Sequence, residues 1–207
     1  MSYLNEKASF IPTVTAGLPD DKTVTVKKAF LGQAITGWTE GDRPLYGELL
    51  AEVAAAGCKP DTITFCWMQG ETDAMAGDSE PYETRLLRLI ENLRADLDFP
   101  DMGFVTGRLN GCRGEHWDRI RAAQVSVAES DPRGAWVDTD DLMCDSGGVH
   151  FTVGGYEQLG ARFATAAVKL AAGVEAEPAI TSGIQESHEK PDDTGGCFCS
   201  TISWRDQ

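Results

Sequence analysis

The sequence is short of basic residues, and no apolar run in it approaches the roughly 20 residues that a membrane-spanning helix needs. Its 18 Lys and Arg residues stand against 33 Asp and Glu residues, which gives a formal net charge of −15. A protein that tracks nucleic-acid phosphates or binds an anionic membrane surface needs the opposite sign. The charge therefore argues against nucleic acid and membrane as partners and favours a neutral or cationic ligand.

A secretory signal is also missing, because residues 1–7 (MSYLNEK) contain neither a basic flank nor an apolar stretch. The chain as given is expected in the cytoplasm, and outside it if an N-terminal segment is missing. None of the six cysteines forms a C-x-x-C pair. Cys58 and Cys66 lie in apolar segments, where a reduced cysteine behaves as a small hydrophobic side chain. We expect a reduced chain, although an even number of cysteines also permits disulfides.

Short apolar runs alternate with amphipathic segments along most of the chain. Strands are predicted at 23–30, 61–67, 103–107 and 134–138, and helices at 46–58, 80–97, 115–129 and 153–172. Nearly continuous apolar strands between helices are typical of a parallel sheet that is covered by helices on both faces. We therefore predict one α/β domain over residues 1–174, with its functional groups at the carboxyl ends of the strands.

The composition changes after this domain. Residues 175–207 carry seven acidic and two basic residues, a Gly195-Gly196 pair and scattered Ser, Thr and Pro, with no hydrophobic periodicity. Such a segment cannot bury enough apolar surface to offset the entropy that folding removes. It is expected to be an acidic, disordered tail.

The strongest local signal is the segment Trp67–Asp73 (WMQGETD), which directly follows a predicted strand. Gln69 offers an amide donor, and Gly70 allows close backbone approach. Glu71 and Asp73 supply carboxylates. These are the groups that a catalytic loop at a strand end presents. A solvated loop that merely leads into the next helix explains the same residues, and both interpretations stay open.

The second signal is His150, in a glycine-containing loop (DSGGVHF) just before the last predicted helix. An imidazole placed there is a candidate general base. The alternative is a structural histidine whose nitrogens are satisfied within the protein. The aromatic residues Trp38, Trp67, Trp117 and Trp136 leave a similar choice, between stacking on sugars and core packing.

A metal site is the competing interpretation of this region, since Cys112, His116, Cys144 and His150 make two thiols and two imidazoles. Zinc sites bring their ligands as tighter pairs, typically C-x2-4-C with H-x3-5-H. The observed spacings do not match that pattern, so we expect no metal.

Taken together, the two segments resemble the SGNH hydrolase superfamily and, within it, the sialate O-acetylesterase-like carbohydrate esterases. The W-x-Q-G-E-[ST]-D loop of that family is matched by residues 67–73. Its H-[FY] pair and G-Y-x-x-L-G-x-[RK]-[FL]-A helix are matched by residues 150–151 and 155–164. A weaker third match is the glycine with a nearby tryptophan at residues 32–38. The resemblance covers about residues 3–172 and implies a flavodoxin-like three-layer sandwich with a parallel sheet.

The resemblance also implies a function, the hydrolysis of acetyl esters of small molecules or polysaccharides by a Ser–His–acid mechanism without a metal or cofactor. His150 would be the general base and then the general acid. The side-chain amide of Gln69 and the backbone N–H of Gly32 would hold the oxyanion, with Gly70 beside them. Glu71 would support either that oxyanion site or the histidine.

The sequence departs from the family pattern at two places, the nucleophile and the acid. The nucleophile of the family follows the first strand in a G-Q-S-N or G-D-S block, and no such block precedes Val24. The carboxylate of the triad usually stands two or three residues before the histidine. The nearest acid here, Asp145, stands five before it, and it would be the catalytic acid only if the glycine-rich loop folds back. The alternative function is a catalytically inactive, carbohydrate-binding relic of the family.

One G-D-S sequence does occur, at residues 77–79, but it follows a polar loop rather than a strand. A serine directly before Glu80-Pro81 is expected to cap a helix. The first strand of the fold therefore has no counterpart, and the domain is expected to be incomplete at its N-terminus. Its two neighbours, at 23–30 and 61–67, would then pair directly or leave unpaired edges that promote aggregation.

Overall fold

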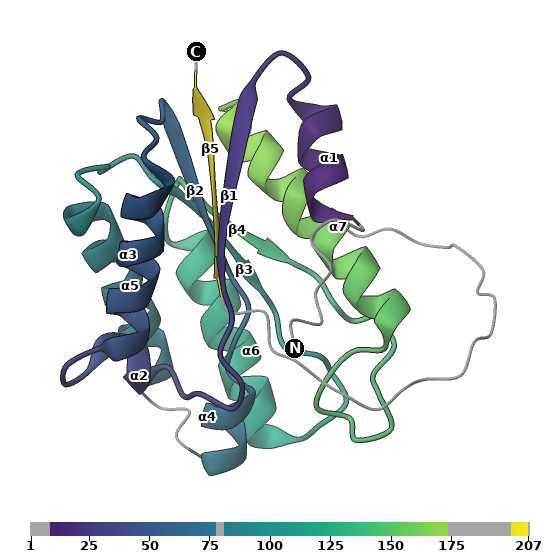
Figure 1. Cartoon of the computed structure of the whole chain (residues 1–207). Coiled ribbons are helices and arrows are strands. Elements are labelled where there is room, and N and C mark those ends of the chain that lie inside the picture. The colour runs from purple at the N-terminus through teal and green to yellow at the C-terminus, as the bar shows by residue number, and fades with distance from the viewer. Residues whose placement is uncertain (1–8, 78–80, 174–199, 207) are drawn as a thin grey trace.

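The computed structural model describes residues 9–77 and 81–173, and the backbone of residues 200–206 (Figure 1). Its elements, in chain order, are α1 (Phe10–Gly17), β1 (Lys22–Lys28), α2 (Thr36–Thr39), α3 (Pro44–Ala56), β2 (Thr62–Trp67), α4 (Glu71–Ala76), α5 (Tyr82–Asp96), β3 (Gly103–Gly107), α6 (Glu115–Glu129), β4 (Gly134–Val137), α7 (Val153–Ala171) and β5 (Ser200–Asp206). The four strands and four helices predicted from periodicity are all present. The short helices α2 and α4 were not predicted.

The five strands form one mixed sheet in the order β1-β5-β2-β3-β4. Strands β2, β3 and β4 run parallel, and β5 runs antiparallel to both of its neighbours, so β1 is parallel to the other three. All five residues of β3 are buried, as are the last five of β2. Burial on both faces explains the continuous apolar runs in these strands and confirms the predicted parallel sheet.

Helices cover both faces of the sheet. Helix α7 packs against β2, β3 and β4, with α1 beside it, while α3 packs on β1 and α6 on β3 and β4 from the other side (Figure 1). The buried positions of α5 (Leu86, Leu89, Ile90, Leu93) recur at helical spacing, as the sequence predicts. The predicted three-layer, flavodoxin-like architecture is confirmed.

The place between β1 and β2 is taken by β5 from the C-terminus, not by an earlier strand. Ser200 pairs with Lys28, and Ile202 pairs with Val26 on one side and Phe65 on the other. The expectation that β1 and β2 would pair directly or leave open edges is therefore wrong. Residues 200–206 also differ from the predicted disordered tail. They form a strand because their backbone pairs with β1 on one side and with β2 on the other. The rest of that predicted tail, 175–199 and 207, lies outside the described residues, as does Ser79.

For three of the four tryptophans, the structure decides between sugar stacking and core packing, the two roles that the sequence leaves open. Trp38, Trp67 and Trp117 are buried, and the rings of Trp38 and Trp67 meet edge to face with centroids 5.2 Å apart. These three are core residues rather than sugar platforms. No helix within the described ranges is long and apolar enough to cross a membrane.

Candidate functional site at the carboxyl ends of the strands

The loop after β2 enters the protein interior instead of solvent. The main-chain oxygen of Gln69 accepts hydrogen bonds from the Tyr82 hydroxyl, at 2.7 Å, and from the Gln124 amide, at 2.8 Å. Burial raises the pKa of Tyr82, and the charges of Asp73 and Glu71 add to that effect. Tyr82 therefore stays a neutral donor, and the loop is held from both sides.

Gly70 is required at the turn into α4. Its φ is +139°, and a Cβ atom there would lie 2.7 Å from Cγ2 of Ile120. Only glycine combines that backbone angle with so close an approach. Glu71 follows as the first residue of α4 and is itself 5% exposed. The sequence-predicted loop is thus a compact, buried element, and the interpretation as a solvated loop is wrong.

The side chain of Gln69 connects this loop to the one that contains Gly32. Its Nε2 donates to the main-chain oxygen of Gln33, at 2.9 Å, and to Oδ2 of Asp73, at 2.6 Å. The carboxylate of Asp73 also accepts from the backbone N–H of Ile35, at 3.1 Å. The loop after β1 and the loop after β2 are therefore joined. Gly32 itself is exposed, in the left-handed conformation with φ +64°.

His150 lies in a short hairpin, closed by a single β-bridge, in the loop that follows β4. The backbone N–H of Asp145 donates to the oxygen of His150, at 2.8 Å, and an isolated bridge joins Cys144 to Phe151. Oδ1 of Asp145 accepts the backbone N–H groups of Val149 and His150. The Nδ1 atom of His150 is buried and has no hydrogen-bond partner among the described residues. Asp145 thus stabilises the hairpin backbone rather than the imidazole.

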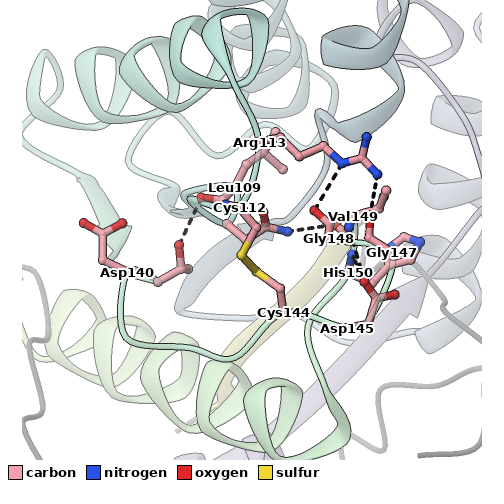
Figure 2. The surroundings of a disulfide bond; sticks show 12 residues. Leu109, Cys112, Arg113, Asp140, Cys144, Asp145, Gly147, Gly148, Val149 and His150 are labelled. Atoms are coloured by element: carbon pink, nitrogen blue, oxygen red, sulfur yellow. Dashed lines mark hydrogen bonds between the residues drawn. A yellow bond between two sulfur atoms is a disulfide. The ribbon is translucent and has the colours of Figure 1, made fainter.

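Three contacts fasten this hairpin to the loop after β3 (Figure 2). Cys112 and Cys144 form a disulfide, Asn110 donates to the Val149 oxygen at 2.8 Å, and Arg113 donates to the Gly147 and Gly148 oxygens. The expectation of a fully reduced chain is wrong for this pair. The disulfide also removes both thiolates from the competing zinc site, and no group of three or more ligands suited to a metal occurs in the described part of the chain.

Gln124 links the candidate residues across the carboxyl edge of the sheet. Its Nε2 donates to the Gln69 oxygen, and its Oε1 accepts the N–H of Leu109, at 2.8 Å each. The next residue, Asn110, holds the His150 hairpin. The loops after β2, β3 and β4 are thereby connected in series, and the Gln69 and His150 loops lie at the same edge. Gln124, Asn110 and the disulfide were missed by sequence analysis, since no local pattern marks them.

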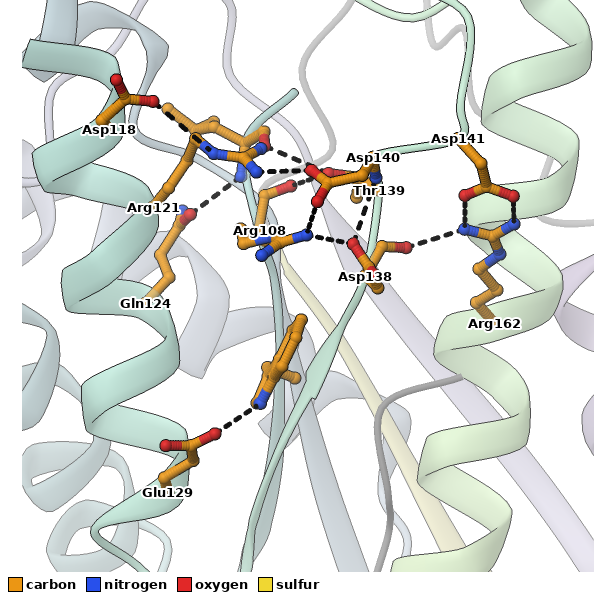
Figure 3. A network of polar contacts seen from close by, with 12 residues as sticks. Arg108, Asp118, Arg121, Gln124, Glu129, Asp138, Thr139, Asp140, Asp141 and Arg162 are labelled. Atoms are coloured by element: carbon orange, nitrogen blue, oxygen red, sulfur yellow. Dashed lines mark hydrogen bonds and ion pairs between the residues drawn. The ribbon is translucent and has the colours of Figure 1, made fainter. Parts of the chain in front are cut away.

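Ion pairs fix the start of the loop that leads to His150 (Figure 3). Arg108 bonds to Asp138 and Asp140, and its guanidinium lies over the Trp136 ring, 4.9 Å from the centroid. From α7, Arg162 bonds to both carboxylate oxygens of Asp141, at 2.6 Å. The start of this loop is therefore held by Arg108 on one side and by Arg162 on the other.

The chain is similar to known carbohydrate esterases. Residues 4–169 match the family described as carbohydrate esterase, sialic acid-specific acetylesterase. The chain is 31% identical over 137 residues to a probable carbohydrate esterase of Arabidopsis thaliana, At4g34215, which covers 65% of this chain and 51% of that protein. The crystal structure of the Arabidopsis protein matches with a TM-score of 0.56 and 29% identity, over 67% of this chain and 57% of that one. The chain thus spans about half the length of this relative.

Proposed function

The chain belongs to the carbohydrate esterase family of sialic acid-specific acetylesterases, and we propose that its carboxyl-edge site binds and hydrolyses the acetyl ester of a carbohydrate. The observation that carries the proposal is the Gln69 side chain, whose amide nitrogen meets the Gly32–Gln33 turn at the ends of two parallel strands. An amide N–H and a backbone N–H that converge on one point can stabilise an oxyanion.

Each candidate residue has a role in this proposal. Gln69 and Gly32 would donate to the acetyl oxygen, and the turn at Gly70 would keep Gln69 in place. His150 would act as general base and then as general acid. Glu71 and Asp145 would support the site through the loops that they belong to, Asp145 by holding the backbone of the His150 hairpin.

A second candidate function is carbohydrate binding without turnover. It is favoured by the surroundings of His150, since within the described residues no hydroxyl or thiol is hydrogen-bonded to the imidazole and Nδ1 has no partner. A serine is a weak nucleophile unless a base is within hydrogen-bond reach. Strand β5 lies between β1 and β2, and its backbone begins at Ser200, which pairs with Lys28 at the carboxyl edge of the sheet. Ser200 is therefore the serine whose hydroxyl is tested below.

Hydrolysis of an O-acetylated sialic acid and of p-nitrophenyl acetate separates the two candidates. A general base contributes about 10²–10⁴-fold, so in an active esterase His150→Ala lowers kcat/KM by at least about 100-fold. The exposed imidazole of His116 provides the matched control, His116→Ala. Ser200→Ala tests whether that hydroxyl is needed. Saturable binding with little turnover would favour the second candidate. Robust hydrolysis lost in His150→Ala would establish the esterase, and absence of both binding and turnover would contradict both functions.

A further inference from the structure

The two amide hydrogens of Gln69 have partners of different kinds. One goes to Asp73, a carboxylate with 0% of its surface exposed, and the other to the main-chain oxygen of Gln33, in an exposed turn. Both partners are acceptors only, so the amide nitrogen, and not the oxygen, must face them. The orientation of the amide is therefore settled by its neighbours.

This orientation persists although it leaves a polar atom unsatisfied. Oε1 of Gln69 is buried and has no hydrogen-bond partner within the described part of the chain. A flipped amide would place that oxygen against the Asp73 carboxylate and the Gln33 carbonyl, which is worse. A hydrogen bond to a charged acceptor is about twice as strong as a neutral one. Asp73 is accordingly the partner that decides the orientation.

Because both hydrogens are engaged, Gln69 can donate to an oxyanion only if one partner withdraws. Asp73 cannot withdraw readily, since it is buried and also accepts the N–H of Ile35. Gln33, in contrast, is an exposed residue that follows Gly32, and within the described residues its oxygen accepts a hydrogen bond only from Gln69. It is the partner that an arriving ligand oxygen can replace.

We propose that Asp73 is a positioning residue that holds one hydrogen of the Gln69 amide, while the Gln33 carbonyl occupies the oxyanion position on the other. This inference rests on the proposed acetyl-ester site. An ester oxygen that gains negative charge takes the place of the Gln33 oxygen, and the turn at Gly32 moves aside. The Asp73 carboxylate holds the amide in one rotational position, so its remaining hydrogen keeps pointing to the oxyanion position. The same carboxylate, through Ile35, keeps the two loops together.

The test is an amide NMR spectrum of the whole 207-residue chain labelled with ¹⁵N, read at the side-chain protons of Gln69. Without ligand, the two protons are expected to be resolved and to exchange by rotation at least about tenfold more slowly than those of the exposed Gln158. Acetate, the product of deacetylation, serves as the probe of the oxyanion position. On titration, the proton bonded to Gln33 should shift together with the Gly32 and Gln33 backbone amides, and the proton bonded to Asp73 should not.

Variants at position 73 supply the second measurement. Asp73→Asn is expected to speed exchange of the Gln69 pair and to raise the acetate dissociation constant about tenfold to a hundredfold, while Asp73→Glu, which keeps the carboxylate, recovers part of the loss. Asp20→Asn, at an exposed position between α1 and β1, is the charge-matched control and should change neither value. If Asp73→Asn does not fold, the role of Asp73 is still tested by two measurements on the wild type: the exchange rate of the Gln69 protons and the shift of only one of them on addition of acetate.

Two results would overturn the role of Asp73: Gln69 protons that exchange as fast as those of Gln158, or acetate shifts of equal size on both protons. A third result separates this inference from the proposed function. In that result, the Gln69 protons exchange slowly but acetate shifts no signal at Gly32, Gln33 or His150. The acetyl site would then be wrong, and so would the replacement of the Gln33 carbonyl by a ligand oxygen. Asp73 would remain the group that orients the Gln69 amide.

Discussion

Cys112 and Cys144 form a disulfide that ties the loop after β3 to the hairpin that carries His150 (Figure 2). The two residues are 32 positions apart, and Cys112 lies in an exposed segment. A cross-link of this span restricts the unfolded chain, and Asn110 and Arg113 add hydrogen bonds beside it. The disulfide is therefore one of three contacts that hold the hairpin of His150.

Removal of the disulfide should destabilise the whole domain. For the double variant Cys112→Ser/Cys144→Ser we expect a loss of about 2–4 kcal/mol in the free energy of unfolding, measured with urea. Reductant should have the same effect on the wild type and none on the double variant. Cys58→Ser, at a free and partly buried thiol, is the control and should keep its sensitivity to reductant. Equal urea midpoints with and without reductant in the wild type would refute the cross-link.

Gly70→Ala is expected to cost about 2–4 kcal/mol, because alanine meets both an unfavourable backbone angle and the Ile120 side chain. Gly47→Ala is the matched control. Gly47 lies inside α3 with open space around its Cα, so alanine there should stabilise the chain by about 0.5–1 kcal/mol. Thermal unfolding of the two variants should shift in opposite directions. A neutral Gly70→Ala variant would mean that the turn before Glu71 is not built as described.

Elements with a strong local period could be predicted closely from the sequence, while long-range pairings could not. The strand at 103–107 and the helix at 115–129 have the bounds that their apolar spacing indicates. Strand β5 lies in a segment of acidic composition, and its place depends on a gap between β1 and β2 that is distant in the sequence. The hydrogen bond from Ile35 to Asp73 spans 38 positions and leaves no local pattern. The motif around Gln69 indicates the chemistry of the site, but it does not indicate that the Gln69 amide donates to Asp73 and to the Gln33 carbonyl.

The ion pair between Arg162 and Asp141 should make stability depend on pH in the acid range. Hydrogen bonds from Arg162 lower the pKa of Asp141, with burial acting in the opposite direction. A carboxyl with a lowered folded pKa adds stability above its ordinary value of 3.8 and loses it as the pH falls through the folded value.

Asp141→Asn should therefore lower the free energy of unfolding by about 1 kcal/mol at pH 7, a modest figure because Asp141 is half exposed. The difference should shrink below about pH 4, because Asp141 of the wild type is then protonated and, like the asparagine of the variant, carries no charge. Asp118→Asn, at an exposed acid that is 4.0 Å from Arg121, is the control with little expected effect. A difference that grows toward low pH would contradict the sign of this coupling.

The central position of β5 can be tested with a proline. The backbone of Ile202 is paired on both sides, and a central strand uses each N–H in one ladder or the other. Ile202→Pro should lower the free energy of unfolding by at least about 1–3 kcal/mol and expose an edge that promotes aggregation. Ile202→Val, which keeps the N–H, is the control. An unchanged urea midpoint in the proline variant would place β5 outside the sheet.

The most direct test of the acetyl-ester site is a crystal structure of the 207-residue chain with an O-acetylated sialic acid. The account predicts that the acetyl oxygen lies within hydrogen-bond distance of Gln69 Nε2 and the backbone N–H of Gly32, in the place of the Gln33 oxygen, with the His150 ring on the ester side. A ligand bound on another face, or an acetyl group turned away from Gln69 and Gly32, would contradict it.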